Sequence, residues 1–185
     1  MVNFIWENIF RRTKNGEDID AALTENYLFK GLSKSERSFV KTLVHARQYR
    51  AGEAVFRQGE LGIGMYMIVH GSINISVEDP TAVDDAARAT FITRLSDGDF
   101  FGEIALVEQT GRRTATATAA SEAWLLGFFK PDLAEIVERN PRLAVKILTH
   151  LSEVLGRRLK ETTDRFTEVK RDLKALAKSE HHDKS

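Results

Sequence analysis

Short apolar runs separated by glycine fill the middle of this 185-residue chain, between Arg47 and Phe129. Examples are residues 54–58, 65–71 and 72–78. Glycines mark the ends of such runs, at positions 52, 59, 62, 64, 71 and 98. Closely spaced short strands with glycine turns are typical of a β-sandwich or a barrel. We therefore expect a mainly β core in this region.

Helical signals flank that core. Ser33 followed by Glu36 matches a capping box, and apolar residues then follow at helical spacing. After the strands, Pro131 opens a short predicted helix and Pro141 a long one that we expect to end near Lys178. The predicted class is thus α+β, mainly β. We divide the chain into residues 1–20, 21–140 and 141–185.

Residues 2–12 predict a short amphipathic helix with a bulky apolar face that includes Trp6, and residues 13–20 predict a polar link. A helix of this length has only marginal stability in isolation, so it must pack against another surface. We expect it to dock on its own domain or across a dimer. The alternative is contact with a partner protein or a peripheral membrane surface, because Trp and Phe beside Arg11 and Arg12 suit an interface.

Composition excludes several classes of protein. Lys plus Arg and Asp plus Glu both number 27, so the zero net charge argues against a strongly basic nucleic-acid binder. The absence of cysteine excludes disulfides, thiolate zinc sites and cysteine-ligated iron–sulfur clusters. No run of 18 apolar residues and no signal peptide pattern is present, so we expect a cytoplasmic protein.

The histidines give no sign of a metal site. They lie at positions 45, 70, 150, 181 and 182, without the spacing of a ligand cluster. No nucleophile–base–acid set is evident either. We therefore expect no metal and no catalytic residue, and we disfavour the alternative of a metal-dependent or nucleotide-processing enzyme.

The stretch Phe100–Ala117 combines groups that suit a small phosphodiester with a ribose. Gly102 precedes a short apolar helix whose N-terminus favours an anion, and it lets the backbone approach a ligand. Glu103 can accept a hydrogen bond from a sugar hydroxyl. Arg113 offers a fork of donors for phosphate oxygens, and Thr114 adds a hydroxyl.

Residues Phe101–Leu106 and Arg113–Ala115 resemble the two halves of the phosphate-binding cassette of the cyclic nucleotide-binding domain family. That family includes the bacterial catabolite activator protein, regulatory subunits of cAMP-dependent protein kinase and cyclic nucleotide-gated channels. The resemblance extends over roughly residues 25 to 165. It implies an eight-stranded antiparallel jelly-roll barrel with flanking N-terminal helices and a long C-terminal helix.

The resemblance also implies a ligand site. Arg113 and the N–H groups near Glu103, Ile104 and Ala105 would bind the phosphate, and Glu103 the ribose 2′-OH. Apolar side chains such as Leu61, Ile63 and Leu106 would line the pocket. The alternative is that Glu103 and Arg113 form an ion pair in a domain that binds no ligand and acts as an interaction scaffold.

The long C-terminal helix has a heptad seam, in which apolar positions alternate steps of three and four residues. These positions are Leu159, Thr162, Phe166, Val169, Leu173 and Leu176. Such a seam predicts a parallel homodimer. The alternative is a helix that folds back on its own domain.

Residues Arg157–Thr163 resemble the matching part of the catabolite activator's long helix. This likeness implies that Thr162 and Thr163 contact the amino group of adenine, one of them from the other subunit. These two residues favour cAMP as the ligand, whereas Thr114 leaves cGMP as an alternative. No helix-turn-helix follows, so we expect no DNA binding. The predicted function is a stand-alone cAMP receptor that signals to an unknown effector protein through movement of its C-terminal helix.

Overall fold

The structure is a computed structural model that describes residues 19–78, 89–108 and 111–182, with side chains to residue 174. The chain divides into two compact units, Met1–Ile147 and Leu148–Ser185. The predicted helix over residues 2–12, including Trp6, and the predicted polar loop over residues 79–88 lie outside the described residues. None of the described helices is long and apolar enough to cross a membrane.

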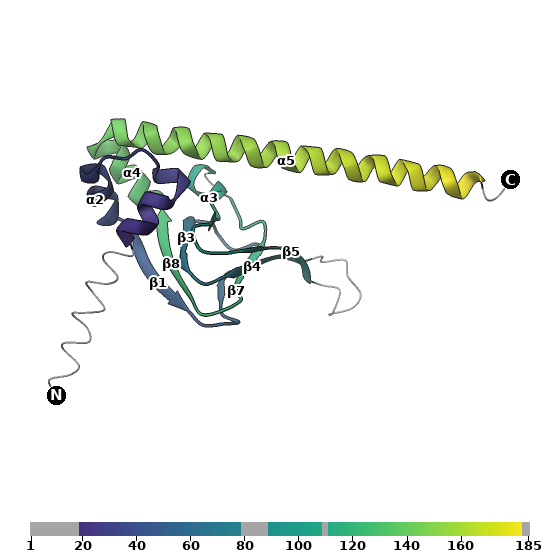
Figure 1. Cartoon of the computed structure of the whole chain (residues 1–185), viewed down its shortest axis with the longest axis horizontal. Coiled ribbons are helices and arrows are strands. Elements are labelled where there is room, and N and C mark those ends of the chain that lie inside the picture. Colours follow the sequence, from purple (N-terminus) through teal and green to yellow (C-terminus); the bar gives the residue numbers. More distant parts are fainter. Residues whose placement is uncertain (1–18, 79–88, 109–110, 183–185) are drawn as a thin grey trace. The chain divides into compact units, whose positions relative to one another are not determined.

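Eight strands are found among the described residues of the first unit, as predicted. They are β1 (His45–Tyr49), β2 (Ala54–Phe56), β3 (Gly64–His70), β4 (Ile73–Glu78), β5 (Ala89–Leu95), β6 (Phe100–Phe101), β7 (Thr116–Ala119) and β8 (Ala123–Phe129). All ladders are antiparallel, and they form two sheets with the orders β1-β8-β3-β6 and β2-β7-β4-β5. Figure 1 labels β1, β8 and β3 of the first sheet and β7, β4 and β5 of the second. The predicted closed barrel is therefore not seen in the described residues, because no ladder joins the edge strands of the two sheets.

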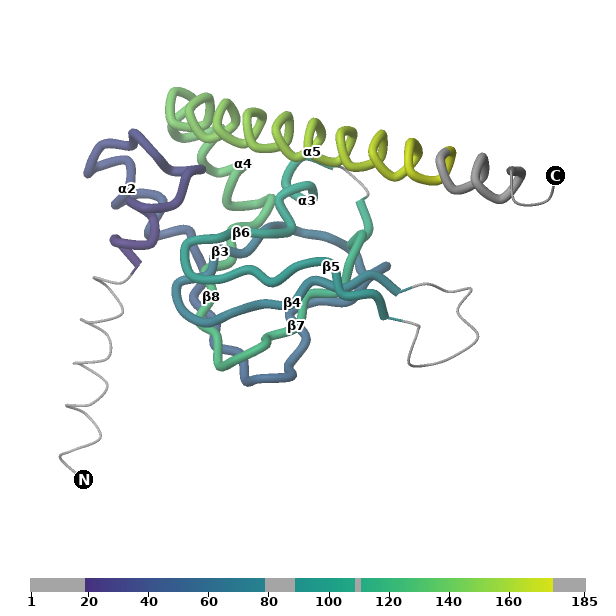
Figure 2. Tube along the Cα trace, turned by 45° about the vertical axis from the view of Figure 1, so that its right-hand side comes forward, coloured from purple at the N-terminus to yellow at the C-terminus, as the bar shows by residue number. Residues whose placement is uncertain are grey.

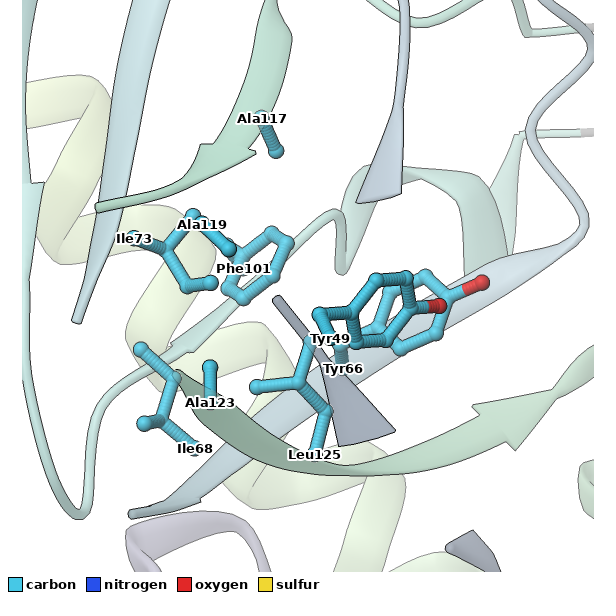
Figure 3. Close-up of a cluster of buried hydrophobic side chains, with 9 residues drawn as sticks. All are labelled: Tyr49, Tyr66, Ile68, Ile73, Phe101, Ala117, Ala119, Ala123 and Leu125. Carbon is cyan, nitrogen blue, oxygen red and sulfur yellow. The ribbon is translucent and has the colours of Figure 1, made fainter. Parts of the chain in front are cut away.

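The core lies between these two sheets (Figure 3). One sheet contributes large side chains, among them Tyr66, Phe101 and Leu125, and β7 of the other contributes Ala117 and Ala119. Ala117 and Ala119 are 0% and 1% exposed. Bulky rings on one sheet facing methyl groups on the other allow the two layers to pack closely.

Helices flank the strands in the first unit. Residues 19–25 are helical, followed by η1 (Tyr27–Phe29), α2 (Lys34–Lys41), α3 (Ile104–Val107), α4 (Lys130–Arg139) and the start of α5 (Pro141–His182). The helices opened by Pro131 and Pro141 are confirmed. The helix α5 ends at His182 rather than near Lys178, because no glycine or proline follows Lys178 to stop it.

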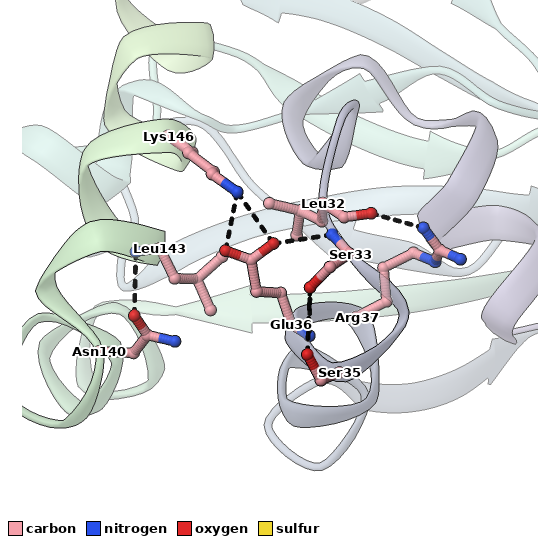
Figure 4. Close-up of polar contacts among 8 residues, drawn as sticks. All are labelled: Leu32, Ser33, Ser35, Glu36, Arg37, Asn140, Leu143 and Lys146. Carbon is pink, nitrogen blue, oxygen red and sulfur yellow. Dashed lines mark hydrogen bonds and ion pairs between the residues drawn. The ribbon is translucent and has the colours of Figure 1, made fainter.

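A polar cluster at α2, which we call the Glu36 clasp, consists of Ser33, Glu36 and Lys146 (Figure 4). The capping box is confirmed: the Ser33 hydroxyl accepts from the Glu36 N–H, and Glu36 accepts from the Ser33 N–H at 2.7 Å. Lys146 Nζ donates to both carboxylate oxygens at 2.8 and 2.9 Å. The hydrogen bond from Lys146, followed by that from the Ser33 backbone, lowers the pKa of Glu36. The clasp thus ties α2 to the first turns of α5.

Candidate functional site

The predicted cassette lies where β6 passes into α3, a succession that can be followed in Figure 2. The later half of the cassette is held by the segment 59–62. Gly59 N–H donates to Arg113 O and Arg113 N–H donates to Glu60 O, both at 2.8 Å, and Gly62 N–H donates to Gly111 O at 3.0 Å. Both the N–H and the carbonyl of Arg113 are thus bonded to the segment 59–62, which fixes its backbone.

Gly102 brings the two halves of the cassette together. Its φ is +77°, a conformation that glycine adopts without strain. A Cβ at this position would lie 2.5 Å from Arg113 Nη1 and 3.3 Å from Gly64 O. The Gly102 carbonyl also accepts a hydrogen bond from Arg113 Nη1 at 3.3 Å. Glycine is thus required here both by the backbone and by the approach of the guanidinium.

Arg113 is a buried cation. The residue is only 7% exposed, and its Nε–H has no hydrogen-bond partner. Its guanidinium carbon lies 3.9 Å from the centroid of the Phe56 ring. Burial lowers the pKa of Arg113, while the nearby Tyr66, Glu60 and Glu103 raise it. A charge in this position has lost water without gaining a full set of partners, which is costly.

Glu103 lies at the N-cap of α3 and is 3% exposed. Its side chain does not cap its own helix. Within the described residues, the bonds of Arg113 do not include the Glu103 carboxylate, whose charge acts on the guanidinium through space. The ion pair considered as an alternative in the sequence analysis is therefore not seen here.

The other predicted cassette residues have different environments. Ala105 is buried, and its N–H donates to Gly102 O at 3.2 Å, so this group is already used. Ile104 and Thr114 are exposed. Of the predicted pocket lining, Leu106 is buried, whereas Leu61 and Ile63 are 64% and 52% exposed. The structure thus brings Gly102, Glu103 and Arg113 together and places Thr114 at the surface.

Thr162 and Thr163 belong to the second unit. Each hydroxyl donates to the carbonyl four residues earlier, Arg158 O at 2.8 Å and Leu159 O at 2.9 Å. Their role in contacting a base stays a prediction.

Sequence reasoning missed the aromatic side chains beside Arg113. Phe56 faces the guanidinium, and Tyr66 acts on it through space. The position of Phe56, three residues before Gly59, is only a weak indication of this contact. No spacing rule tells which strand residue will point toward an arginine 57 positions later. Among the described residues, no three His, Asp or Glu side chains are grouped as metal ligands would be.

Comparison with known proteins links this geometry to a family. The family model described as "Cyclic nucleotide-binding domain" matches residues 46–140. A protein from Rhodopseudomonas palustris, described as a candidate potassium channel protein, is 36% identical over 71% of this chain. The cyclic AMP receptor protein of Thermus thermophilus is 31% identical over 72% of this chain. The chain spans 30% and 57% of the lengths of these two relatives.

The fold also matches solved structures. The crystal structure of the Thermus thermophilus catabolite activator protein superposes with a TM-score of 0.67 at 26% sequence identity. The match covers 78% of this chain and 63% of that one.

Proposed function

This chain belongs to the cyclic nucleotide-binding domain family, as the cassette predicted, and we propose from this premise that it is a receptor for cAMP. The observation that supports the proposal is the buried Arg113, whose Nε–H lacks a hydrogen-bond partner. A relative named as a cyclic AMP receptor protein supports the choice of ligand.

The phosphate is the group that completes the environment of Arg113. Burying an incompletely paired cation costs several kcal/mol, and a phosphate oxygen that accepts from Nε–H offsets that cost when the ligand arrives. Charge-assisted bonds to a guanidinium are also among the strongest hydrogen bonds in proteins. In this proposal Glu103 accepts the hydrogen bond of the ribose 2′-OH, and Gly102 gives the ligand access to the backbone.

Thr162 and Thr163 are the proposed base contacts. Because each hydroxyl donates to a helix carbonyl, what remains for a ligand is the acceptor capacity of the oxygen. The exocyclic amino group of adenine is a donor, whereas O6 of guanine is an acceptor. This difference favours cAMP over cGMP at that edge of the base.

The proposed output passes through α5. Four apolar positions of its seam, Leu159, Phe166, Val169 and Leu173, are 56–69% exposed. Apolar residues at heptad spacing are typical of a helix pair, so we propose a homodimer through α5 that signals to an effector protein in the cytoplasm. Stand-alone action without DNA binding stays a prediction.

The proposal is tested by measuring the melting temperature with cAMP, cGMP and cyclic dinucleotides, followed by calorimetry. We expect stabilisation by cAMP above all. Arg113→Ala should weaken cAMP binding by about 30-fold or more, because loss of one partner of a buried charged contact costs ~2–5 kcal/mol. The matched control is Arg112→Ala, which removes an exposed arginine bonded to Gly59 O and should change the affinity less than about threefold.

Two outcomes would contradict the proposal. If no cyclic nucleotide raises the melting temperature of the folded protein, the interaction scaffold becomes the better description. If Arg113→Ala binds cAMP with nearly native affinity, the assignment of the phosphate site is wrong. A larger rise of the melting temperature with cGMP than with cAMP would agree with a cyclic nucleotide receptor but would contradict the proposed preference for adenine.

A further inference from the structure

The ring of Phe56 lies against the guanidinium of Arg113. The 3.9 Å separation between the guanidinium carbon and the ring centroid is well within cation–π range. Because Arg113 is buried, water competes little with this contact, and its strength lies toward the upper end for such pairs. A cation–π contact uses the face of the guanidinium and leaves the N–H edge in its plane available to a ligand.

The strand β2 has an irregular register at this ring. Ala54 pairs with Thr118, but Phe56 pairs with Ala117 rather than Thr116, so the register shifts by one residue between them. In a regular strand Val55 and Phe56 would face opposite sides of the sheet. Both instead pack against the same core cluster. Register irregularities often re-aim a side chain beside a functional site, and this one coincides with the contact between Phe56 and Arg113.

Neighbouring rings hold Phe56 in place. Its centroid is 5.7 Å from that of Phe101 and 6.1 Å from that of Tyr66. The rings of Tyr66 and Phe101 are themselves stacked, with centroids 5.7 Å apart and an interplanar angle of 23°. A ring fixed from two sides has little freedom, so the cation that rests on it is also restricted.

We propose that Phe56 is a positioning residue for ligand binding, which holds the Arg113 guanidinium in the orientation that a phosphate needs. This inference rests on the proposed function. Its physical basis is preorganisation: a side chain with four rotatable bonds is restricted before the ligand arrives, so less freedom is lost on binding. The ring itself makes no bond to the phosphate and acts only through Arg113.

The first test compares substitutions of Phe56 by calorimetry with cAMP. Phe56→Leu removes the aromatic face and should weaken binding about 5- to 30-fold, the range that a partly to fully desolvated cation–π contact corresponds to. Phe56→Tyr retains the face and should bind within about twofold of the native protein. An affinity of Phe56→Leu equal to that of the native protein overturns the inference.

Ile75→Ala is the matched control for lost packing. Ile75 packs against the same cluster and pairs with the same residue, Ala117, from the opposite side of β7. It should lower the melting temperature about as much as Phe56→Leu does while leaving the affinity for cAMP unchanged. Equal loss of affinity in both variants would mean that Phe56 acts through general packing, contrary to the inference.

Two further measurements separate this inference from the proposed function. In the Arg113→Ala background, Phe56→Leu should weaken binding by less than about twofold, because the residue through which it acts is gone. In the ligand-free protein, NMR should show the Arg113 side-chain protons shifted upfield by the ring, and Phe56→Leu should remove that shift. If the upfield shift is seen but no cyclic nucleotide binds, the proposed function is wrong, while the contact between Phe56 and Arg113 is confirmed. If cAMP binds and the shift is not seen, or the two substitutions are additive, the role of Phe56 is wrong.

Discussion

Two cationic side chains of the first unit, Lys146 and Arg113, differ in burial and in hydrogen bonding. Lys146 has a side chain that is 45% exposed, and it is bonded to both oxygens of Glu36. Arg113 is 7% exposed, and its Nε–H has no partner. For stability alone the reverse would be expected, because a buried charge needs a partner more than an exposed one does. The Glu36 clasp therefore serves the fold, whereas the incomplete environment of Arg113 points to a ligand that supplies what is lacking.

The largest expected effect concerns Gly102. In Gly102→Ala, the methyl group would lie 2.5 Å from Arg113 Nη1, and alanine at φ +77° is strained. The guanidinium must move, so we expect calorimetry to show at least about 30-fold weaker cAMP binding. Gly98→Ala is the control: φ is +84°, but the added Cβ meets nothing within 4 Å. It should lose similar stability and keep its affinity; equal weakening in both variants would mean that strain alone is responsible.

Arg113→Met tests whether the buried charge of Arg113 lowers the stability of the protein when no ligand is bound. Methionine is apolar and of similar reach, so it removes the desolvation cost of the buried cation. In urea denaturation without ligand, we expect the free energy of unfolding to stay the same or rise by about 1 kcal/mol. Cyclic AMP should stabilise the native protein and not the variant. A loss of more than about 2 kcal/mol without ligand would show that Arg113 is a structural residue.

Ser33→Ala addresses the capping box. The substitution leaves the Glu36 N–H without its side-chain acceptor, and we expect a loss of about 1 kcal/mol in the free energy of unfolding. Ser35→Ala, two positions further on, should cost less than about 0.5 kcal/mol, since Ser35 is not the N-cap residue. Both variants should bind cAMP normally. A changed affinity in Ser33→Ala would mean that the clasp is part of the ligand response.

Lys146→Met should have the smallest effect, about 0.5 kcal/mol near neutral pH, because this ion pair is partly exposed. The pKa of Glu36 is lowered in the folded state from an ordinary value of 4.5. Its contribution to stability is thus present above pH 4.5 and is lost as the pH falls through the lowered pKa. The gap between the native protein and the variant should close on acidification, as urea denaturation across this pH range would show. A gap that persists after Glu36 is protonated would mean that packing by Lys146 matters more than its charge.

Local features of the fold were predictable because their causes are local. The apolar runs bounded by glycine predicted β3 and β4, and the pair Ser33 and Glu36 predicted the start of α2. The arrangement of the strands in two sheets was not predictable in this way, since ladders between distant strands depend on the whole chain. The register shift in β2 is likewise a property of the pairing with β7 and leaves no mark in the sequence.

The residues of the candidate site were predictable from their resemblance to a known motif, and only partly from the physical properties of the side chains. Arg112 and Arg113 are identical in type and adjacent, yet one is exposed and the other is buried. Composition and periodicity cannot separate them, whereas the resemblance to a cassette selects Arg113. The predicted lining stays a prediction: Leu61 and Ile63 lie in the turn between β2 and β3 and are exposed, and their apolar character alone does not tell whether they face a ligand.

The methyl side chain of Ala117 has a consequence well beyond its own strand. Ala117 is fully buried and pairs with both Phe56 and Ile75, so its size limits how deeply the neighbouring rings can settle between the layers. A valine there would compete for the volume that the rings now fill and push them outward. The small side chain of Ala117 thus sets how deep between the two sheets Phe56, and with it the guanidinium of Arg113, can lie.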